Sequence, residues 1–214
     1  MSGDAARGAD AVLELRHRPI QKRGIERFEA ILAAARSVLA DQGYEHFTIE
    51  DVATRAAVPV GSVYQYFPNK YALVAELAAQ DTQFLVAAID EAGPNFPSAE
   101  WQQELEDLLE LFAQLWADDP WRPAVYAAMR STAATRRRAA QNTAAVAQAV
   151  AKLLAALTPH LDPDQRFEVA IVLVETCQTL LNLSVQDGSL NTAVVAELKR
   201  LTRAYLRSVA LSTN

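Results

Sequence analysis

The chain has 214 residues, of which 51% are hydrophobic and 21% charged, so it is long enough and apolar enough to bury a core. Its single cysteine, Cys177, excludes an internal disulfide and gives no sign of an oxidising compartment. We find no signal peptide and no run of about 18 apolar residues. The sequence therefore predicts a cytoplasmic protein without a membrane partner.

The charges are distributed unevenly along the chain. The net charge of −6 argues against nucleic acid as a partner. However, residues 16–73 hold eight basic and six acidic residues, a local charge of +2, whereas residues 81–214 hold eleven and sixteen, a local charge of −5. An acidic body with a mildly basic N-terminal part is compatible with DNA binding by that part alone.

The N-terminal residues 1–23 are predicted to be an arm outside the folded domains. Residues 1–15 lack periodicity, and we expect them to be disordered. Positive charge gathers in residues 16–23, RHRPIQKR. Two interpretations stay open: a solvated tail, or an arm that lies along a DNA groove through Arg16, Arg18, Lys22 and Arg23.

Three helices are predicted in residues 24–75. The first runs from Ile25 to Gln42 and ends at Gly43. Thr48 is a candidate N-cap for a second helix that ends near Ala56, with Asp51 at the capping-box position. The break at Pro59 leads to a short third helix, Ser62 to Phe67. Two short helices joined by about four residues form a helix-turn-helix.

Further helices are predicted throughout residues 76–214, which we assign to a second domain. The first of them runs from Asn69 or Lys70 to about Ala92, and the next from a cap at Ser98 to Asp118. Two more are expected over residues 121–131 and 134–157. The last two run from a cap at Asp162 over residues 163–186 and from a cap at Asn191 to Leu211. We expect no strand. The predicted fold is all-α, with about nine helices.

The segment from Thr48 to Leu73, TIEDVATRAAVPVGSVYQYFPNKYAL, resembles the DNA-binding signature of the tetracycline-repressor (TetR) family. Its most specific part is the Tyr-x-Tyr-Phe-x-Asn-Lys run from Tyr64 to Lys70. The match extends over roughly Phe28 to Leu77, and beyond residue 80 the resemblance is only architectural. The resemblance implies a dimeric regulator that binds DNA near its N-terminus and a small ligand further on.

The third helix has the features of a recognition helix. Candidate base-contacting residues are Val60, Gly61, Ser62, Tyr64 and Gln65, because small or amide-bearing residues suit close approach to base edges. Thr48, Tyr66 and Lys70 suit phosphate oxygens, as their family equivalents do. The alternative for Thr48 is a cap, and for the two tyrosines it is packing. Pro59-Val60 replaces a polar pair, often with lysine, found in many family members.

Aromatic residues between positions 84 and 129 are candidates for an apolar ligand pocket. Each one could equally fill the core, and the expectation of a pocket rests mainly on the family resemblance. The candidate lining residues are Phe84, Trp101, Phe112, Trp116, Trp121, Tyr126 and Met129, with Arg130, Thr176, Cys177 or Gln178 as neighbouring groups and polar handles.

The last two predicted helices are candidates for a homodimer interface. Each is apolar over more than one narrow stripe, as expected of a helix buried on two sides. Two copies would form a four-helix bundle across a two-fold axis, whereas the alternative is a thick monomeric core. The candidate interface residues are Phe167, Ile171, Val174, Leu181, Val194, Leu198, Leu201 and Tyr205.

The sequence thus predicts a DNA-binding transcriptional regulator, a repressor released from a palindromic operator by a small, largely apolar ligand. An enzyme is not expected, because the chain has no HExxH or CxxC spacing and no glycine-rich phosphate loop. For the same reason we expect no cofactor and no metal. The alternative is an all-α ligand-binding or adaptor protein whose helix-turn-helix no longer binds DNA.

Overall fold

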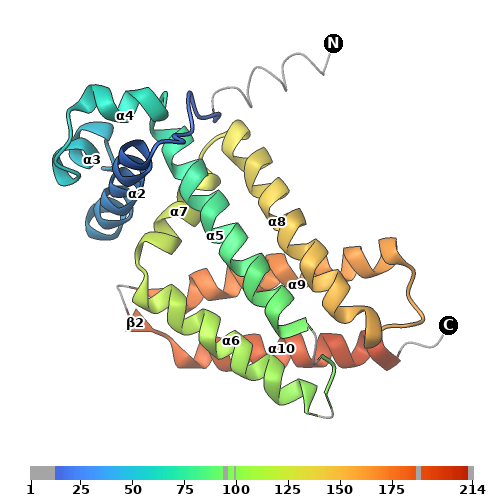
Figure 1. Cartoon of the computed structure of the whole chain (residues 1–214). Helices are drawn as coiled ribbons and strands as arrows, with labels where there is room; N and C mark the ends of the chain where they lie inside the picture. The colour runs from blue at the N-terminus through green and yellow to red at the C-terminus, as the bar shows by residue number, and fades with distance from the viewer. Residues whose placement is uncertain (1–12, 94–95, 99, 187–188, 212–214) are drawn as a thin grey trace. The chain divides into compact units, whose positions relative to one another are not determined.

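The computed structural model describes residues 13–93, 96–98, 100–186 and 189–211 (Figure 1). Nine α-helices lie in these residues, which confirms the all-α fold. They are α2 (Lys22–Gln42), α3 (Ile49–Arg55), α4 (Val60–Tyr66), α5 (Lys70–Ala92), α6 (Trp101–Asp118), α7 (Trp121–Met129), α8 (Ala133–Leu153), α9 (Pro163–Ser184) and α10 (Thr192–Leu211). A 3-10 turn, η2 (Leu154–Ala156), follows α8.

The chain divides into two compact units. The N-terminal unit comprises Met1–Gln80 and Pro120–Ala140, and the C-terminal unit comprises Asp81–Asp119 and Gln141–Asn214. Residues 120–140, which the sequence placed in the second domain, therefore belong by their contacts to the N-terminal unit. In that unit α2 packs against both α3 and α7, and α3 packs against α4.

Helix starts follow the local capping chemistry. Thr48 caps α3 and accepts a hydrogen bond from the Asp51 amide at 3.1 Å. Asp162 forms a reciprocal capping box with Gln165 at the start of α9. Ser98 does not cap α6, because its hydroxyl accepts from the Glu100 amide and donates to the Glu104 carboxylate, so the helix begins at Trp101.

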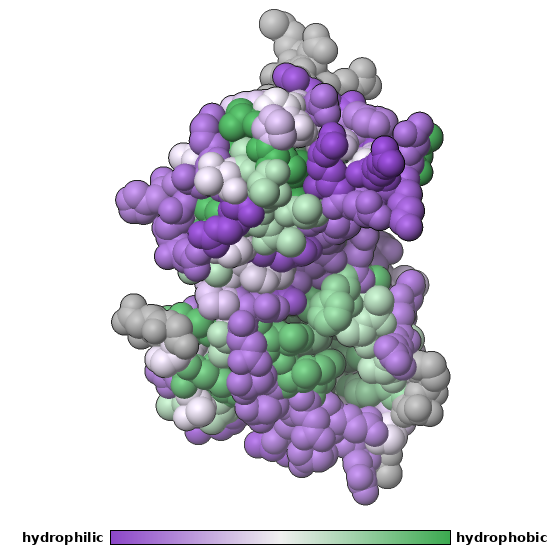
Figure 2. Space-filling model, turned by 60° about the vertical axis from the view of Figure 1, so that its left-hand side comes forward, coloured by the Kyte–Doolittle hydropathy of each residue, from purple (hydrophilic) through white to green (hydrophobic). Residues whose placement is uncertain are grey.

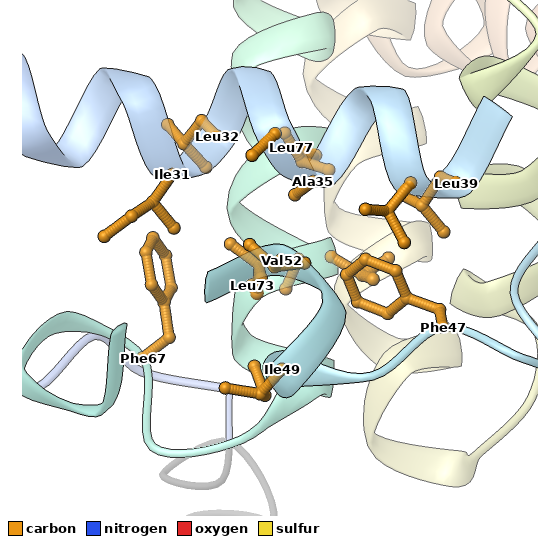
Figure 3. Packing of buried hydrophobic residues seen from close by; sticks show 14 of the residues in the cluster. Ile31, Leu32, Ala35, Leu39, Phe47, Ile49, Val52, Phe67, Leu73 and Leu77 are labelled. Carbon is orange, nitrogen blue, oxygen red and sulfur yellow. The ribbon is translucent and has the colours of Figure 1, made fainter. Parts of the chain in front are cut away.

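The core of the N-terminal unit holds the helix-turn-helix rigidly. One side of α2 presents Ile31, Leu32, Ala35 and Leu39 to the elements below it (Figure 3). Phe67, at the end of α4, points toward Ile31 and stacks on Phe28 with ring centroids 5.2 Å apart. Val52 and Ala53 of α3 and Val63 and Tyr66 of α4 are buried in the same core, so the exposed face of each helix is the opposite one.

The C-terminal unit has a separate core built around α6. Leu109, Ala113 and Trp116 on α6 pack with residues of α5, α8, α9 and α10. The helices α9 and α10 pack along each other, and α6 packs against both. This arrangement leaves a cavity between the helices of the unit.

Two expectations for short segments are wrong. A two-stranded antiparallel pair, β1 (Val185–Gln186) and β2 (Ser189–Leu190), replaces the end of the helix predicted to reach Gln186, with Val185 opposite Leu190. The Asn191 amide also donates to the Ser184 carbonyl at 2.7 Å, so the chain reverses by pairing its backbone groups. The sequence also predicts a turn at Asp187-Gly188, and these two residues lie outside the described residues.

The second wrong expectation concerns the start of the arm. Leu13 is buried in the core of the N-terminal unit, and Leu15 packs against that core. The Arg16 amide donates to the Tyr66 carbonyl at 2.9 Å. Residues 13–15 are therefore ordered by burial of two leucines, while residues 1–12 of the predicted tail lie outside the described residues.

Ala57 closes α3 in a conformation that favours glycine. Its φ is +53°, and the Val58 and Ala57 amides donate to the Ala53 and Thr54 carbonyls, the pattern of a Schellman motif with Ala57 at C′. We predict that Ala57→Gly raises the free energy of unfolding by about 0.5–1 kcal/mol, because relief of the left-handed strain exceeds the added chain entropy.

The measurement is thermal unfolding, with a rise in Tm of about 2–4 °C per kcal/mol expected for a chain of this size. Ala56→Gly is the matched control. Ala56 has φ −78° in the right-handed region, so glycine there should lower the Tm. An equal effect of both substitutions would contradict the strain at Ala57.

Candidate nucleic-acid interface and ligand cavity

The helix α4 presents small and polar residues on its outer face. Val63 and Tyr66 are buried on its inner side, whereas Gly61 and Gln65 are exposed and one helical turn apart. A Cβ atom at Gly61 would meet no protein atom within 4 Å. Glycine lowers helix stability relative to alanine, so the internal packing of this unit gives no reason for glycine at this position.

The other predicted base-contacting residues lie beside this exposed face. Ser62 is half-buried, and its amide donates to the Pro59 carbonyl at 2.8 Å. Val60 and Tyr64 are also half-buried and pack against the core. Gly61 and Gln65 are thus the most accessible of the five candidates, and Ser62 is accessible in part.

Thr48 is exposed, but its hydroxyl already has two partners. It accepts from the Asp51 amide and donates to the Asp51 carboxylate. Hydrogen bonds from Thr48 and then Gln42 lower the pKa of Asp51. The capping interpretation of Thr48 therefore has direct geometric support, and a phosphate would have to share this hydroxyl.

Lys70 lies at the first turn of α5 and is half-buried. Its Nζ donates to the Phe47 carbonyl at 3.4 Å and lies 4.8 Å from the centroid of the Tyr44 ring. Asn69 caps the helix, because its Oδ1 accepts from the Ala72 amide at 2.9 Å. An ammonium group has three donors, so these contacts orient Lys70 and leave capacity for a phosphate oxygen.

Tyr66 is only 5% exposed. Its ring packs edge-on against Phe28 with centroids 5.4 Å apart, and its hydroxyl donates to the Gly24 carbonyl at 3.4 Å. The packing interpretation of this tyrosine therefore has the stronger geometric support. Its sequence neighbour Phe67 is buried as well, which shows that both rings fit in the core.

The basic arm separates into two pairs of residues. Arg16 donates to the Tyr64 carbonyl at 3.1 Å, and Arg18 makes two 2.8 Å hydrogen bonds to the carboxylate of Glu76, which is 7% exposed. Lys22 and Arg23 are exposed at the start of α2, whose first turn has no acidic residue. Neither forms an ion pair with a residue that the structure describes.

The C-terminal unit encloses a cavity of about 550 Å³. Its walls come from α5, α6, α8, α9 and α10 and are mainly apolar. Leu85, Ile89, Leu109, Phe112, Trp116 and Val174 are among the lining residues. The volume is within the range of small-molecule binding sites, about 300–1,000 Å³.

A few polar side chains interrupt this apolar wall. Thr202 is 2% exposed, and its Oγ1 lies 3.9 Å from the Cys177 Sγ. Burial raises the pKa of the Cys177 thiol to about 11, despite the opposing hydrogen bond from Thr202. The thiol therefore stays protonated at neutral pH and is a weak nucleophile. Glu104 and Asp107 on α6 also line the cavity and are exposed.

Comparisons with known proteins agree with both parts of this geometry. Residues 31–77 match a family model described as bacterial regulatory proteins, tetR family. Residues 99–210 match a model described as the tetracyclin repressor-like C-terminal domain, which covers more than half of the chain. The chain belongs to the TetR family.

Two curated transcriptional repressors are similar over part of their length. The transcriptional repressor KstR of Rhodococcus jostii (strain RHA1) is 32% identical over 95 residues, which is 44% of this chain and 43% of that protein. KstR of Mycolicibacterium smegmatis is 36% identical over 67 residues, or 31% and 33% of the two chains. The chain thus matches less than half the length of either relative.

Solved structures of transcriptional regulators, one of them described as TetR-family, match over most of the chain. One from Streptomyces coelicolor has a TM-score of 0.65 and 27% identity, and covers 86% of this chain and 99% of that one. FadR from Bacillus subtilis, in complex with stearoyl-CoA, has a TM-score of 0.62 and 18% identity over 87% and 100% of the two chains. The second likeness shows the fold alone.

Three of the ten predicted ligand residues line the cavity of this TetR-family chain: Phe112, Trp116 and Cys177. Trp121 and Met129 belong to the core of the N-terminal unit instead, and the Arg130 guanidinium lies 3.5 Å from the centroid of the Tyr126 ring in that same unit. Proximity in sequence was misleading, because the chain passes from one unit to the other at Pro120.

The remaining ligand candidates stay in the C-terminal unit but do not line the cavity. Phe84 is half exposed, and Trp101 packs edge-on against Phe96 with centroids 6.3 Å apart. Thr176 is half-buried on α9. Gln178, considered as a polar handle, does line the cavity. No sequence pattern indicated Thr202, Glu104 or Asp107.

The predicted dimer residues divide by burial. Val174, Leu181 and Leu198 are buried in the core of the C-terminal unit, so they are not available to a partner. Phe167, Ile171, Val194 and Tyr205 are half-buried, and Leu201 is exposed. Val172 and Leu183 on α9, which were not predicted, are 50% and 49% exposed, and Leu201 on α10 is 46% exposed.

The helix α9 is unusually apolar for its exposure. By length and composition alone, α5 and α9 could each span a membrane, but core helices of soluble proteins pass the same test. Half of the apolar window of α5 is buried, whereas only 28% of that of α9 is. Val172 and Leu183 are the large exposed hydrophobic residues of α9. Figure 2 shows hydrophobic residues, bordered by hydrophilic ones, on one face of the molecule without assigning them to a helix. A protein partner would remove such an apolar surface from water.

Proposed function

We propose that this protein is a homodimeric, sequence-specific transcriptional repressor, released from a palindromic operator by a small, largely apolar ligand. The observation that carries the proposal is the outer face of α4. There, Gly61 and Gln65 are exposed while the opposite side of the helix is anchored in a close-packed core. A rigid helix with a small residue near its N-terminus suits entry into the major groove.

In this proposal, the side chains of Gln65 and Ser62 make the hydrogen bonds to base edges. The amide of Gln65 has the donor and acceptor needed for a bidentate contact with adenine. Gly61 allows the backbone of α4 to approach the bases closely. Lys70, held by Phe47 and Tyr44, supplies a charge to the phosphate backbone, where contacts position the helix without reading sequence.

The dimer in this proposal forms through the exposed faces of α9 and α10. Val172, Leu183 and Leu201 supply the apolar surface that a second copy would cover. A two-fold dimer places two recognition helices on half-sites separated by one helical turn of DNA, about 34–36 Å, or a multiple. The weak burial of α9 supports a partner on this face.

The ligand acts by shifting a conformational equilibrium. A molecule that fills the cavity among α5, α6, α8, α9 and α10 changes DNA affinity only if it binds one conformation of the protein better than another. The apolar wall favours an apolar ligand body. An effector that left DNA affinity unchanged would contradict release by ligand.

The deciding experiment is fluorescence anisotropy of a labelled duplex from the DNA flanking this protein's own gene, titrated at two salt concentrations. We expect saturable binding that survives competitor DNA and weakens with salt. Binding that is weak and indifferent to sequence across a tiled set of duplexes would reject the regulator. The adaptor alternative would then be preferred.

The two pairs of arm residues should differ in the same assay. We predict that Lys22→Ala/Arg23→Ala makes the slope of log K against log salt shallower by about 0.9 for each phosphate that the arm no longer neutralises, up to about 2 in total. Arg18→Ala removes the same kind of charge, but its guanidinium is already paired with Glu76. The slope for this control should equal that of the unmodified protein within experimental error. An equal change in both variants would contradict the assignment of Lys22 and Arg23 as phosphate contacts.

A further inference from the structure

We propose that the cavity selects its ligand by charge: it takes an apolar molecule whose outer end is cationic or uncharged, and it rejects one whose outer end is a carboxylate. This inference rests on the proposed ligand-binding function. It adds the chemical class of the ligand, which is determined by side chains at the two ends of the cavity.

Two of the residues that line the cavity are acidic and solvent-exposed. Glu104 and Asp107 both line it and are both exposed, as is the neighbouring Leu111. The Ser98 hydroxyl donates to Glu104 at 2.7 Å, and the Gln103 amide donates to Asp107 at 2.8 Å. Neither carboxylate forms an ion pair with any residue in the described part of the chain, so no basic side chain there offsets their charge.

The other flank of α6 shows the contrasting arrangement. Glu106 pairs with Arg203 and Glu110 pairs with Lys199, both from α10. The acidic residues that face α10 are therefore neutralised, whereas those that face the cavity are not. No lysine, arginine or histidine is among the described residues that line the cavity.

The enclosed side of the cavity offers hydrogen bonds but no charge. Thr202 is almost fully buried there, with the Cys177 thiol at 3.9 Å as a weak partner. A buried hydroxyl with so poor a partner can hydrogen-bond a hydroxyl or carbonyl of a ligand. A charged ligand group beside Thr202 would lose its hydration without an opposite charge to compensate, which disfavours its binding there.

The physical argument for selectivity follows from these two ends. A ligand carboxylate at the opening would lie beside two like charges, next to low-dielectric walls that weaken screening. An ammonium group in the same place would be attracted by both. An uncharged end would feel neither effect, so its affinity should lie between the two.

Three ligands with one shared body test this order: 10-amino-1-decanol, 1,10-decanediol and 10-hydroxydecanoate. Each has a hydroxyl for Thr202, and only the other end changes. Calorimetric titration of the DNA-free protein should give the tightest binding for the amine. The carboxylate should bind at least about tenfold more weakly, which corresponds to about 1.4 kcal/mol.

Variants separate the two ends of the cavity. In Glu104→Gln/Asp107→Asn, the difference between amine and carboxylate should shrink to less than about threefold. Glu26→Gln/Glu29→Gln, two exposed residues of α2 in the N-terminal unit, changes the net charge equally and should keep the full difference. Thr202→Val should weaken all three ligands by a similar factor, about fivefold.

The inference is overturned if 10-hydroxydecanoate binds the unmodified protein as tightly as the amine, or if the α2 control abolishes the preference. It is also overturned if none of the three ligands binds. DNA anisotropy with the same preparation reports separately on the regulator, so its failure is distinguishable from failure of the charge selection.

Discussion

Gly61→Leu is expected to weaken specific DNA binding on the order of 100-fold, about 2.7 kcal/mol. The added side chain would project from the exposed face of α4, where no protein atom lies within 4 Å of the new Cβ. It would therefore clash with DNA and not with the protein. Since leucine is a better helix former than glycine, the free energy of unfolding should stay the same or rise by up to about 1 kcal/mol.

Anisotropy with the operator duplex and thermal unfolding together check this result. Gly93→Leu is the matched control, because a Cβ there also meets nothing within 4 Å but the residue lies in the C-terminal unit. It should retain operator affinity. If Gly61→Leu bound the operator normally, α4 would not enter the groove in the proposed way, and a loss of stability would mean that the glycine has a structural role.

Leu201→Glu is expected to dissociate the proposed dimer into monomers at concentrations where the proposal has the unmodified protein dimeric. Leu201 is 46% exposed in the protomer, so glutamate there is tolerated by the monomer. In the proposed interface the same carboxylate would be buried without a partner, at a cost of several kcal/mol. Operator affinity should fall as well, because the two half-sites would no longer be bound as one unit.

Sedimentation equilibrium measures the dimer dissociation constant directly. Leu111→Glu is the control, since Leu111 on α6 is 53% exposed and lies outside the proposed interface. It should leave the dimer intact. Dimers that persisted in Leu201→Glu, or that dissociated equally in Leu111→Glu, would place the interface on another face of the C-terminal unit.

Local patterns in the sequence were sufficient for the helices and for the helix-turn-helix. Ile31, Ala35 and Leu39 recur at helical spacing and form part of the buried side of α2. The caps at Thr48, Asp162 and Asn191 marked helix starts that the structure confirms. Such signals depend on residues three or four apart, which remain neighbours in any helix. The Tyr64–Lys70 run indicated membership of the TetR family, which the comparisons then showed.

Other features depend on which distant segments come together. Trp121 and Trp116 are five residues apart, yet one joins the core of the N-terminal unit and the other lines the cavity. On α9, apolar residues surround much of the helix, so periodicity could not tell the buried Val174 from the exposed Val172. The choice is made by the helices that pack against α9, and these are far away in sequence.

By itself, the sequence determined the fold class, the helix-turn-helix and the family, because each is encoded in short-range periodicity, capping residues and one specific motif. Only the tertiary structure decided that Arg18 forms an ion pair with Glu76 and that Ala57 adopts a left-handed backbone conformation. It also decided that Thr202 and two carboxylates without ion-pair partners in the described residues line one cavity. Burial, ion pairing and cavities arise only when elements separated along the chain are brought into contact, and no local pattern specifies those contacts.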